Sequence, residues 1–140
     1  MDELPHLPEG VVAFVATRGD AGPHVIPVSA LHRAGPRRLL LALTHRRGTL
    51  ARLRARPAVA VALTGTGFAV TAYGSAAVVA DPLPGAEFMV AVAVDVERLA
   101  DHLRPETELR GGVDWGWREP EAAERHDRVV AALAALAAGR

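Results

Sequence analysis

Five arginines and no acidic residue fall within the thirteen residues HRRGTLARLRARP, His45 to Pro57. Guanidinium groups bind phosphate through paired, charge-assisted hydrogen bonds, and free N–H groups at a helix start attract an anion to the same place. Nucleic-acid binding is a second interpretation, but it usually requires aromatic side chains and a broadly basic face, and this stretch has no aromatic residue. A helix with solvated arginines is the third interpretation.

The sequence places this stretch between a strand and a short helix. An apolar run ends at Thr44, Arg46 and Arg47 follow in a loop, and Thr49 is the candidate N-cap of the helix. Pro57 ends the helix because its ring clashes with the preceding turn. The two loop arginines would therefore stand beside the helix start, where a phosphate group gains most from the helix dipole.

Charge is distributed unevenly along a chain that carries no net charge. Residues 1–20 hold four acids and one arginine, residues 21–80 hold eight arginines and no acid, and residues 81–140 hold twelve acids and seven arginines. All sixteen basic residues are arginine. This asymmetry predicts either an anionic ligand on the middle part or an electrostatic match between the middle and C-terminal parts.

Length and composition predict one domain with a real hydrophobic core. The chain has 140 residues, half of them hydrophobic, which excludes a mainly disordered protein. It has no cysteine and no paired histidines at metal-ligand spacing, so we expect no disulfide and no metal site. It shows no long apolar run and no signal peptide, so we expect a cytoplasmic protein without a membrane partner.

Hydrophobic patterning predicts a mainly β fold. Short turns separate apolar, β-branched segments at residues 11–17, 23–32, 37–43, 58–63, 68–80 and 87–96, the first two of which form a hairpin. Such a series favours a β-barrel with peripheral helices, because closure removes exposed edges.

The C-terminal part is predicted to be helical. A helix over about residues 119–138 has Val129, Leu133 and Leu136 as its apolar stripe. Between the strands and this helix we expect a short helix after residue 96, a loop, and a strand over residues 113–117.

In their order, these segments resemble the FMN-binding split β-barrels of the pyridoxamine 5′-phosphate oxidase type, in their small bacterial members. The matching text is AGPHVIPVS, LLLALTHRRGTLARLRARPAVAVAL and FAVTAYGSAAVV, within about residues 9–96. The resemblance implies a homodimer with FMN at the subunit interface, or with the deazaflavin F420 in the same groove. It implies an FMN-dependent oxidoreductase with a small-molecule substrate. The alternative is a non-catalytic protein that binds flavin, F420 or another small ligand.

The resemblance also implies which residues contact the cofactor. The strand from His24 to Ser29 would lie along the isoalloxazine ring, and the residues around the helix start would take the phosphate. Members often have lysine where Thr49 stands and asparagine where Arg52 stands, so Arg47 or Arg52 would supply the missing cation. The implied contacts are His24, Val25, Ile26, Pro27, Val28, Leu43, Thr44, Arg46, Arg47, Thr49 and Arg52.

Few other side chains point to chemistry. His24 is the best candidate for a functional histidine, whereas His102 and His126 are expected to be solvated. Trp115 and Trp117 are expected to pack in an interface, with a lid over flavin or substrate as the alternative. We predict no catalytic residue, because a flavin cofactor carries the redox chemistry itself.

Overall fold

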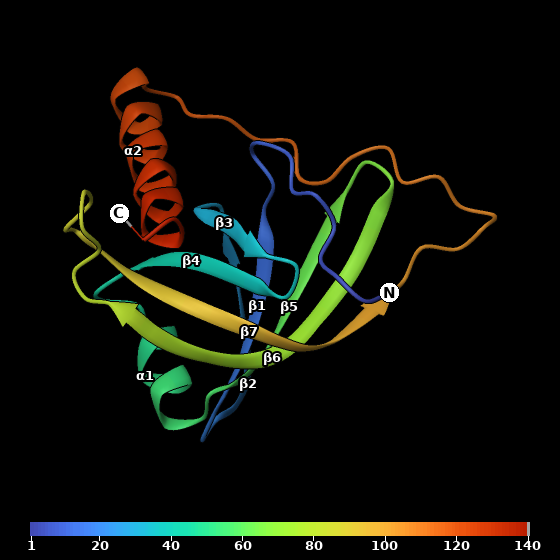
Figure 1. The fold of residues 1–140 in the computed structure, drawn as a ribbon, viewed down its shortest axis with the longest axis horizontal. Coiled ribbons are helices and arrows are strands. Elements are labelled where there is room, and N and C mark those ends of the chain that lie inside the picture. The colour runs from blue at the N-terminus through green and yellow to red at the C-terminus, as the bar shows by residue number, and fades with distance from the viewer. Residues whose placement is uncertain (140) are drawn as a thin grey trace.

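Seven strands form one antiparallel sheet in the order β2-β1-β5-β6-β7-β4-β3, and two helices pack on it (Figure 1). The computed structural model describes residues 1–139. The strands are β1 Ala13–Gly19, β2 Gly22–Val28, β3 Leu31–Gly35, β4 Arg38–Thr44, β5 Ala58–Gly65, β6 Phe68–Ala80 and β7 Met89–Asp101. The helices are α1 Gly48–Ala55 and α2 Pro120–Ala137. The predicted mainly β class with peripheral helices is therefore confirmed.

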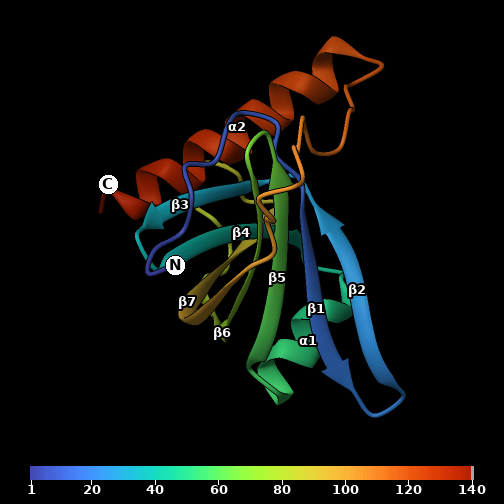
Figure 2. The same ribbon diagram turned by 90° about the vertical axis from the view of Figure 1, so that its right-hand side faces the viewer.

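The two edges of this sheet are strands that follow each other in the sequence. β2 and β3 lie at opposite ends of the strand order, yet only Ser29 and Ala30 separate them. The sheet must therefore curl until its edges meet at these residues (Figure 2), and the Ala30 carbonyl accepts a 3.0 Å hydrogen bond from the Ala42 N–H of β4. Within residues 1–139 no ladder joins β2 to β3, so the barrel expectation holds only for the curl, and the closed barrel is not formed.

The segment predicted as one strand over residues 23–32 is two strands. Residues 22–28 pair with β1 in the predicted hairpin, whereas residues 31–35 pair with β4 at the other edge of the sheet. Pro27, which has no N–H to donate, stands near the end of edge strand β2. The chain then leaves that edge within two residues.

The chain after residue 96 also departs from the prediction. Instead of a short helix, β7 continues to Asp101, because residues 98–101 pair with residues 70–73 of the long strand β6. Cross-strand contacts here outweigh the local helical pattern. Residues 113–117 form no strand and lie in an irregular segment before α2.

Strands β4 and β7 are buried on both faces, which sets the two layers of the fold. Their inner faces carry leucine and valine, whereas their outer faces carry mostly alanine. The small outer residues let α2 pack closely, and Val129, Leu133 and Leu136 lie against them as the predicted stripe. The residues under α2 are Ala30, Leu40, Ala42, Ala91 and Ala93.

Helix α1 lies at the end of the sheet away from α2 (Figure 2) and contacts β1 and β6. Leu50 and Leu53 are buried in the inner core, and the helix ends before Pro57 as predicted. The N-cap prediction for Thr49 is wrong: the helix begins two residues earlier, with Arg47 as the N-cap, and the Thr49 side chain is buried. Within residues 1–139 no helix is long and apolar enough to cross a membrane.

Gly74 permits the closest approach of β6 and β7. The register shifts between Tyr73 and Gly74, and a Cβ atom added at Gly74 would lie 2.0 Å from the Asp95 carbonyl oxygen. We therefore expect Gly74→Ala to lower the free energy of unfolding by about 1–3 kcal/mol, the usual cost of overpacking. Urea denaturation measures this change.

Gly35→Ala is the matched control, since Gly35 also lies in a strand at a register shift, and nothing lies within 4 Å of an added Cβ. Equal stability of the two variants would contradict the close approach of the backbones at Gly74.

Candidate functional site

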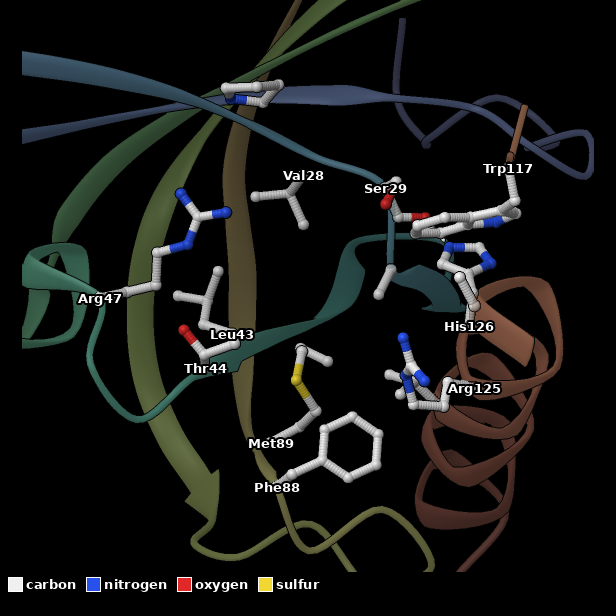
Figure 3. Close-up of a pocket in the computed structure, with 15 residues that line it drawn as sticks. Val28, Ser29, Leu43, Thr44, Arg47, Phe88, Met89, Trp117, Arg125 and His126 are labelled. Atoms are coloured by element: carbon white, nitrogen blue, oxygen red, sulfur yellow. Dashed lines mark hydrogen bonds between the residues drawn. The ribbon is translucent and has the colours of Figure 1, made fainter. Parts of the chain in front are cut away.

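A cavity of about 220 Å³ opens where the two edges of the sheet meet (Figure 3). Its walls come from the end of β2, the two connecting residues, the ends of β4 and β7, and α2. The lining residues are Pro27, Val28, Ser29, Ala30, Ala42, Leu43, Thr44, Arg47, Phe88, Met89, Trp117, Ala122, Arg125, His126 and Val129. The floor is thus largely apolar, and the charged groups stand on two opposite sides.

The first charged side is the start of α1. Arg47 lines the cavity and is the N-cap residue, and it makes no side-chain capping bond. The first turn of α1 holds no acidic residue. The N–H groups of this turn therefore lack a side-chain cap, and their partial positive charge adds to the guanidinium charge.

Arg52 adds a second cation at the same helix start. A Cβ atom at Gly48 would lie 3.3 Å from Arg52 Nη1, and one at Gly19 would lie 3.3 Å from Arg52 Nε. The half-buried Arg52 side chain thus folds back along the first turn of α1 against β1. It does so because neither glycine has a side chain in its way.

Two further arginines of the basic stretch are neutralised by acids from other parts of the chain. Arg54 pairs with Asp81 at 3.4 Å, and Arg56 pairs with Asp20 at 2.7 Å. The hydrogen bond and charge of Arg56 lower the pKa of Asp20 below its ordinary value. Arg54 stays exposed but is paired, because Asp81 at the start of the β6–β7 connection faces it.

The second charged side is α2, which presents Ala122, Arg125, His126 and Val129 to the cavity. These positions follow i, i+3, i+4 and i+7 spacing, so they share one face of the helix. His126 is half-buried rather than solvated as predicted, and its Nε2 lies 3.0 Å from the Ser29 carbonyl oxygen. Since a carbonyl only accepts hydrogen bonds, Nε2 carries the proton. This bond ties α2 to the link between the sheet edges.

Trp115, Trp117 and His126 form an aromatic cluster at the rim of the cavity. The ring centroids lie 5.2 Å apart for the two tryptophans, and 5.5 Å and 5.3 Å from the His126 ring. Trp115 Nε1 donates a 2.8 Å hydrogen bond to the Gly10 carbonyl, which anchors the cluster to the N-terminal segment. Trp117 lines the cavity with its side chain partly exposed, and interface packing and the lid alternative both stay predictions.

The structure brings together about half of the residues expected to contact a cofactor. Pro27, Val28, Leu43, Thr44 and Arg47 line the cavity. The other expected contacts do not line it: His24, Val25, Ile26, Arg46, Thr49 and Arg52.

Those six residues differ in their environments. His24 and Ile26 are half-buried, and Ile26 packs against the inner core. Val25 is 61% exposed on the outer face of the sheet. Thr49 is buried, whereas Arg46 and Arg52 remain near the helix start without reaching the cavity wall.

Sequence reasoning missed the α2 side of the site. Arg125 and His126 were not predicted to line a site, because the direction of a helix face depends on how the helix docks. Phe88, which precedes β7, was not predicted either. The i, i+3, i+4 relation of Arg125 and His126 to the buried stripe residue Val129 was the available signal, since it places them beside the sheet.

The matches between this chain and known proteins come from comparing structures. No protein-family model and no curated protein matches the sequence. An F420 reductase structure superposes with a TM-score of 0.57 at 19% identity, covering 66% of this chain and 90% of the other. A FAD-binding protein from Mesorhizobium loti gives 0.51 at 18% identity, covering 64% and 81%.

A third structure is a Clostridium acetobutylicum protein related to general stress protein 26, of the pyridoxinephosphate oxidase family. It gives a TM-score of 0.54 at 15% identity, covering 66% of this chain and 81% of the other. At these identities the likeness concerns the fold, and at that level it confirms the resemblance seen in the sequence motifs. The chain has the fold of the pyridoxamine 5′-phosphate oxidase-like proteins.

Proposed function

We propose that this protein is an FMN-dependent oxidoreductase of the pyridoxamine 5′-phosphate oxidase-like superfamily, with FMN in the cavity between β2, β4 and α2. The observation that carries the proposal is an uncapped, cationic helix start beside a cavity with apolar walls. Arg47 and the N–H groups of α1 suit a phosphate dianion, with Arg52 behind them. Val28, Leu43 and Met89 suit a flat, largely apolar ring. When bound, the flavin would supply the electron transfer.

A carrier or sensor that binds flavin or F420 without catalysis is the second candidate. It is favoured by the scarcity of acid–base groups: the described residues that line the cavity include no carboxylate, and the Nε2 of His126 is engaged with Ser29. The two candidates share the binding site and differ only in turnover.

Cofactor titration tests the proposal most directly. We expect the purified protein to bind FMN with a perturbed visible absorbance spectrum, in preference to FAD and F420, because the helix start matches a terminal monophosphate. Photoreduced flavoprotein mixed with a panel of electron acceptors then separates an enzyme from a carrier. If FMN, FAD and F420 all fail to bind, the cofactor proposal is wrong.

The phosphate contact has its own test. We expect Arg47→Ala to weaken FMN binding by about tenfold or more, since one charge-assisted hydrogen bond contributes about 1.5–3 kcal/mol. Arg46→Ala should weaken FMN binding less, because Arg46 does not line the cavity. Fluorescence titration with FMN and with riboflavin, which lacks the phosphate, measures both affinities.

Riboflavin affinity should stay constant in the Arg47 variant. Arg54→Ala is the control. Arg54 belongs to the same helix, but it pairs with Asp81 and does not line the cavity. An unchanged ratio of FMN to riboflavin affinity in Arg47→Ala would show that this arginine is only a solvated helix residue.

A homodimer with the cofactor at its interface is part of the proposal. The outer face of an antiparallel sheet is normally polar where it meets water. Here Phe14 lies beside Pro27 and Ala62, and Ala16 lies beside Val25 and Ala60, so this outer face is apolar across β2, β1 and β5. A cavity of about 220 Å³ is also below the usual size of a ligand pocket, which supports completion of the site by a second chain.

A charge placed on that face tests the dimer. We expect Val25→Glu to lower the association constant by at least about tenfold, because a two-fold axis would bury the new carboxylate in both chains. Sedimentation equilibrium measures the change. Val79→Glu is the control, since Val79 is 42% exposed at the far end of β6, beyond the part that pairs with β5. A wild-type protein that is monomeric at micromolar concentration contradicts the dimer.

A further inference from the structure

We propose that a second groove of this protein binds a small organic cation, which lies against tryptophan rings and is neutralised by carboxylates. This N-terminal groove has a volume of about 870 Å³ and lies between residues 6–11, β3, residues 113–117 and α2. Such a volume is usual for a ligand pocket. The groove does not need a flavin, so the inference goes beyond the proposed function and does not rest on it.

Helix α2 uses two neighbouring faces for the groove and for the cofactor cavity. Its groove-facing residues run from Asp127 to Ala134 at i, i+3, i+4 and i+7 spacing, so they share one face. Its cavity-facing residues run from Ala122 to Val129 on the next face. His126 stands at the boundary and lines both. A ligand in the groove therefore contacts a different face of α2 from a ligand in the cavity.

The N-terminal wall of the groove is fixed to the rest of the fold. At one end, the Gly10 carbonyl accepts the hydrogen bond from Trp115 Nε1. At the other end, Arg33 Nε and Nη2 donate hydrogen bonds of 3.2 Å and 3.0 Å to the Leu4 carbonyl. The Leu4 side chain is buried in the inner core. The wall is thus held at both of its ends, which gives the groove a defined shape.

The charges that line the N-terminal groove favour a cation. Its carboxylates are Glu9, Asp114 and Asp127, one from each of three walls. The ion pairs among residues 1–139 include none of these three. The lining arginine, Arg33, is engaged with a backbone carbonyl and lies 3.9 Å from Glu3. The lining histidines add no charge in their neutral form. A cleft with an excess of one charge concentrates ions of the opposite charge.

The groove and the cavity therefore differ in the sign of their charge. Arg125 and Asp127 lie two positions apart on α2, yet the arginine lines the cavity and the aspartate lines the groove. Among residues 1–139 the cavity lining includes no carboxylate. A cationic ligand should thus select the groove over the cavity.

Two tryptophan rings supply an aromatic surface for the cation. Trp115 and Trp117 both line the groove, and their ring planes meet at 80° with the centroids 5.2 Å apart, which forms a corner. The cation–π contact within residues 1–139 is that of Arg98 with Tyr73, so no arginine of this part of the chain lies over either tryptophan ring. An ammonium group within about 6 Å of a tryptophan ring is attracted to its π face.

This arrangement suits an ammonium group on an apolar stem. The stem would pack against the tryptophans and against Val130 and Ala131 of α2, while the ammonium group meets the carboxylates. These stand on separate walls and, among residues 1–139, do not gather into a group that could hold a metal ion. The groove therefore favours an organic cation over a metal ion, which requires several oxygen ligands at one point.

Tryptophan fluorescence tests this site directly, because the two tryptophans of the chain both line the groove. The protein is titrated with benzylammonium and with benzyl alcohol, a neutral analogue of similar shape. The variants are Asp114→Asn and Asp127→Asn, singly and together. Glu124→Gln is the matched control, since it neutralises an exposed acid of α2 that lines neither the groove nor the cavity.

We expect benzylammonium to bind more tightly than benzyl alcohol. Each single variant should weaken benzylammonium binding by about threefold to tenfold, since each removes one partly exposed charge contact. The double variant should weaken it by about tenfold or more, whereas Glu124→Gln should leave it unchanged. Added salt should weaken the binding of benzylammonium but not that of benzyl alcohol.

Other results overturn the cation site. These are equal affinity for the two probes, an unchanged benzylammonium affinity in the double variant, or the same loss in Glu124→Gln as in Asp127→Asn. Calorimetric titration of benzylammonium in the presence of FMN separates this proposal from the cofactor proposal. Competition between the two ligands would place the cation in the cavity and overturn the groove. Failure of FMN to bind, together with benzylammonium binding that depends on Asp127, contradicts the cofactor proposal and supports the groove.

Discussion

The link of two residues between the opposite edges of the sheet is the constraint on which the rest of the structure depends. Ser29 and Ala30 can span only about 10 Å even when fully extended, so strands at the two ends of a seven-stranded order must come together. The sheet curls to meet this requirement, which creates the inner core. Beyond these two residues no ladder of backbone hydrogen bonds joins the two edges among the described residues. The cavity lies at this unpaired part of the sheet. Fold and site thus have the same origin.

Ion pairs then determine which arginines remain free to bind an anion. Two of the five arginines of the basic stretch are paired with acids, because Asp20 and Asp81 approach it from two different turns. The predicted match with the C-terminal part is made here by Asp81, whereas Asp20 belongs to the N-terminal part. The match is incomplete at the start of α1, where Arg47 has no ion-pair partner among the described residues. Exposed ion pairs contribute little stability, so their main effect is on where positive charge remains.

Local sequence patterns predicted where helices and strands lie along the chain better than how these elements pair and pack. Strand β6 matches its predicted bounds, and α2 lies within its predicted range, because periodicity and flanking turns define both. The division of residues 23–32 into two strands was missed, since each half has strand character and only tertiary pairing separates them. The extension of β7 to Asp101 was missed because β6 supplies a partner from far away in the sequence.

The candidate site was predictable to a similar degree. The α1 side of the site is formed where a strand is followed directly by a helix, so its residues could be recognised from the sequence. The α2 side depends on docking of a helix that lies more than seventy residues later in the chain, and on the His126 bond to Ser29. No local sequence pattern indicates such a contact, so the sequence did not predict that α2 would line the cavity.

The alanine-rich contact between α2 and the sheet has a thermodynamic consequence for the site. Because Ala42, Ala91 and Ala93 each bury little apolar area, the helix is held by fewer methylene contacts than the inner core. Undocking of α2 should therefore be among the less costly partial openings of the fold. A ligand that needs the α2 wall binds only the docked state, so it must stabilise the docked helix by linkage. The concentration of such a ligand would then regulate how often this helix leaves the sheet.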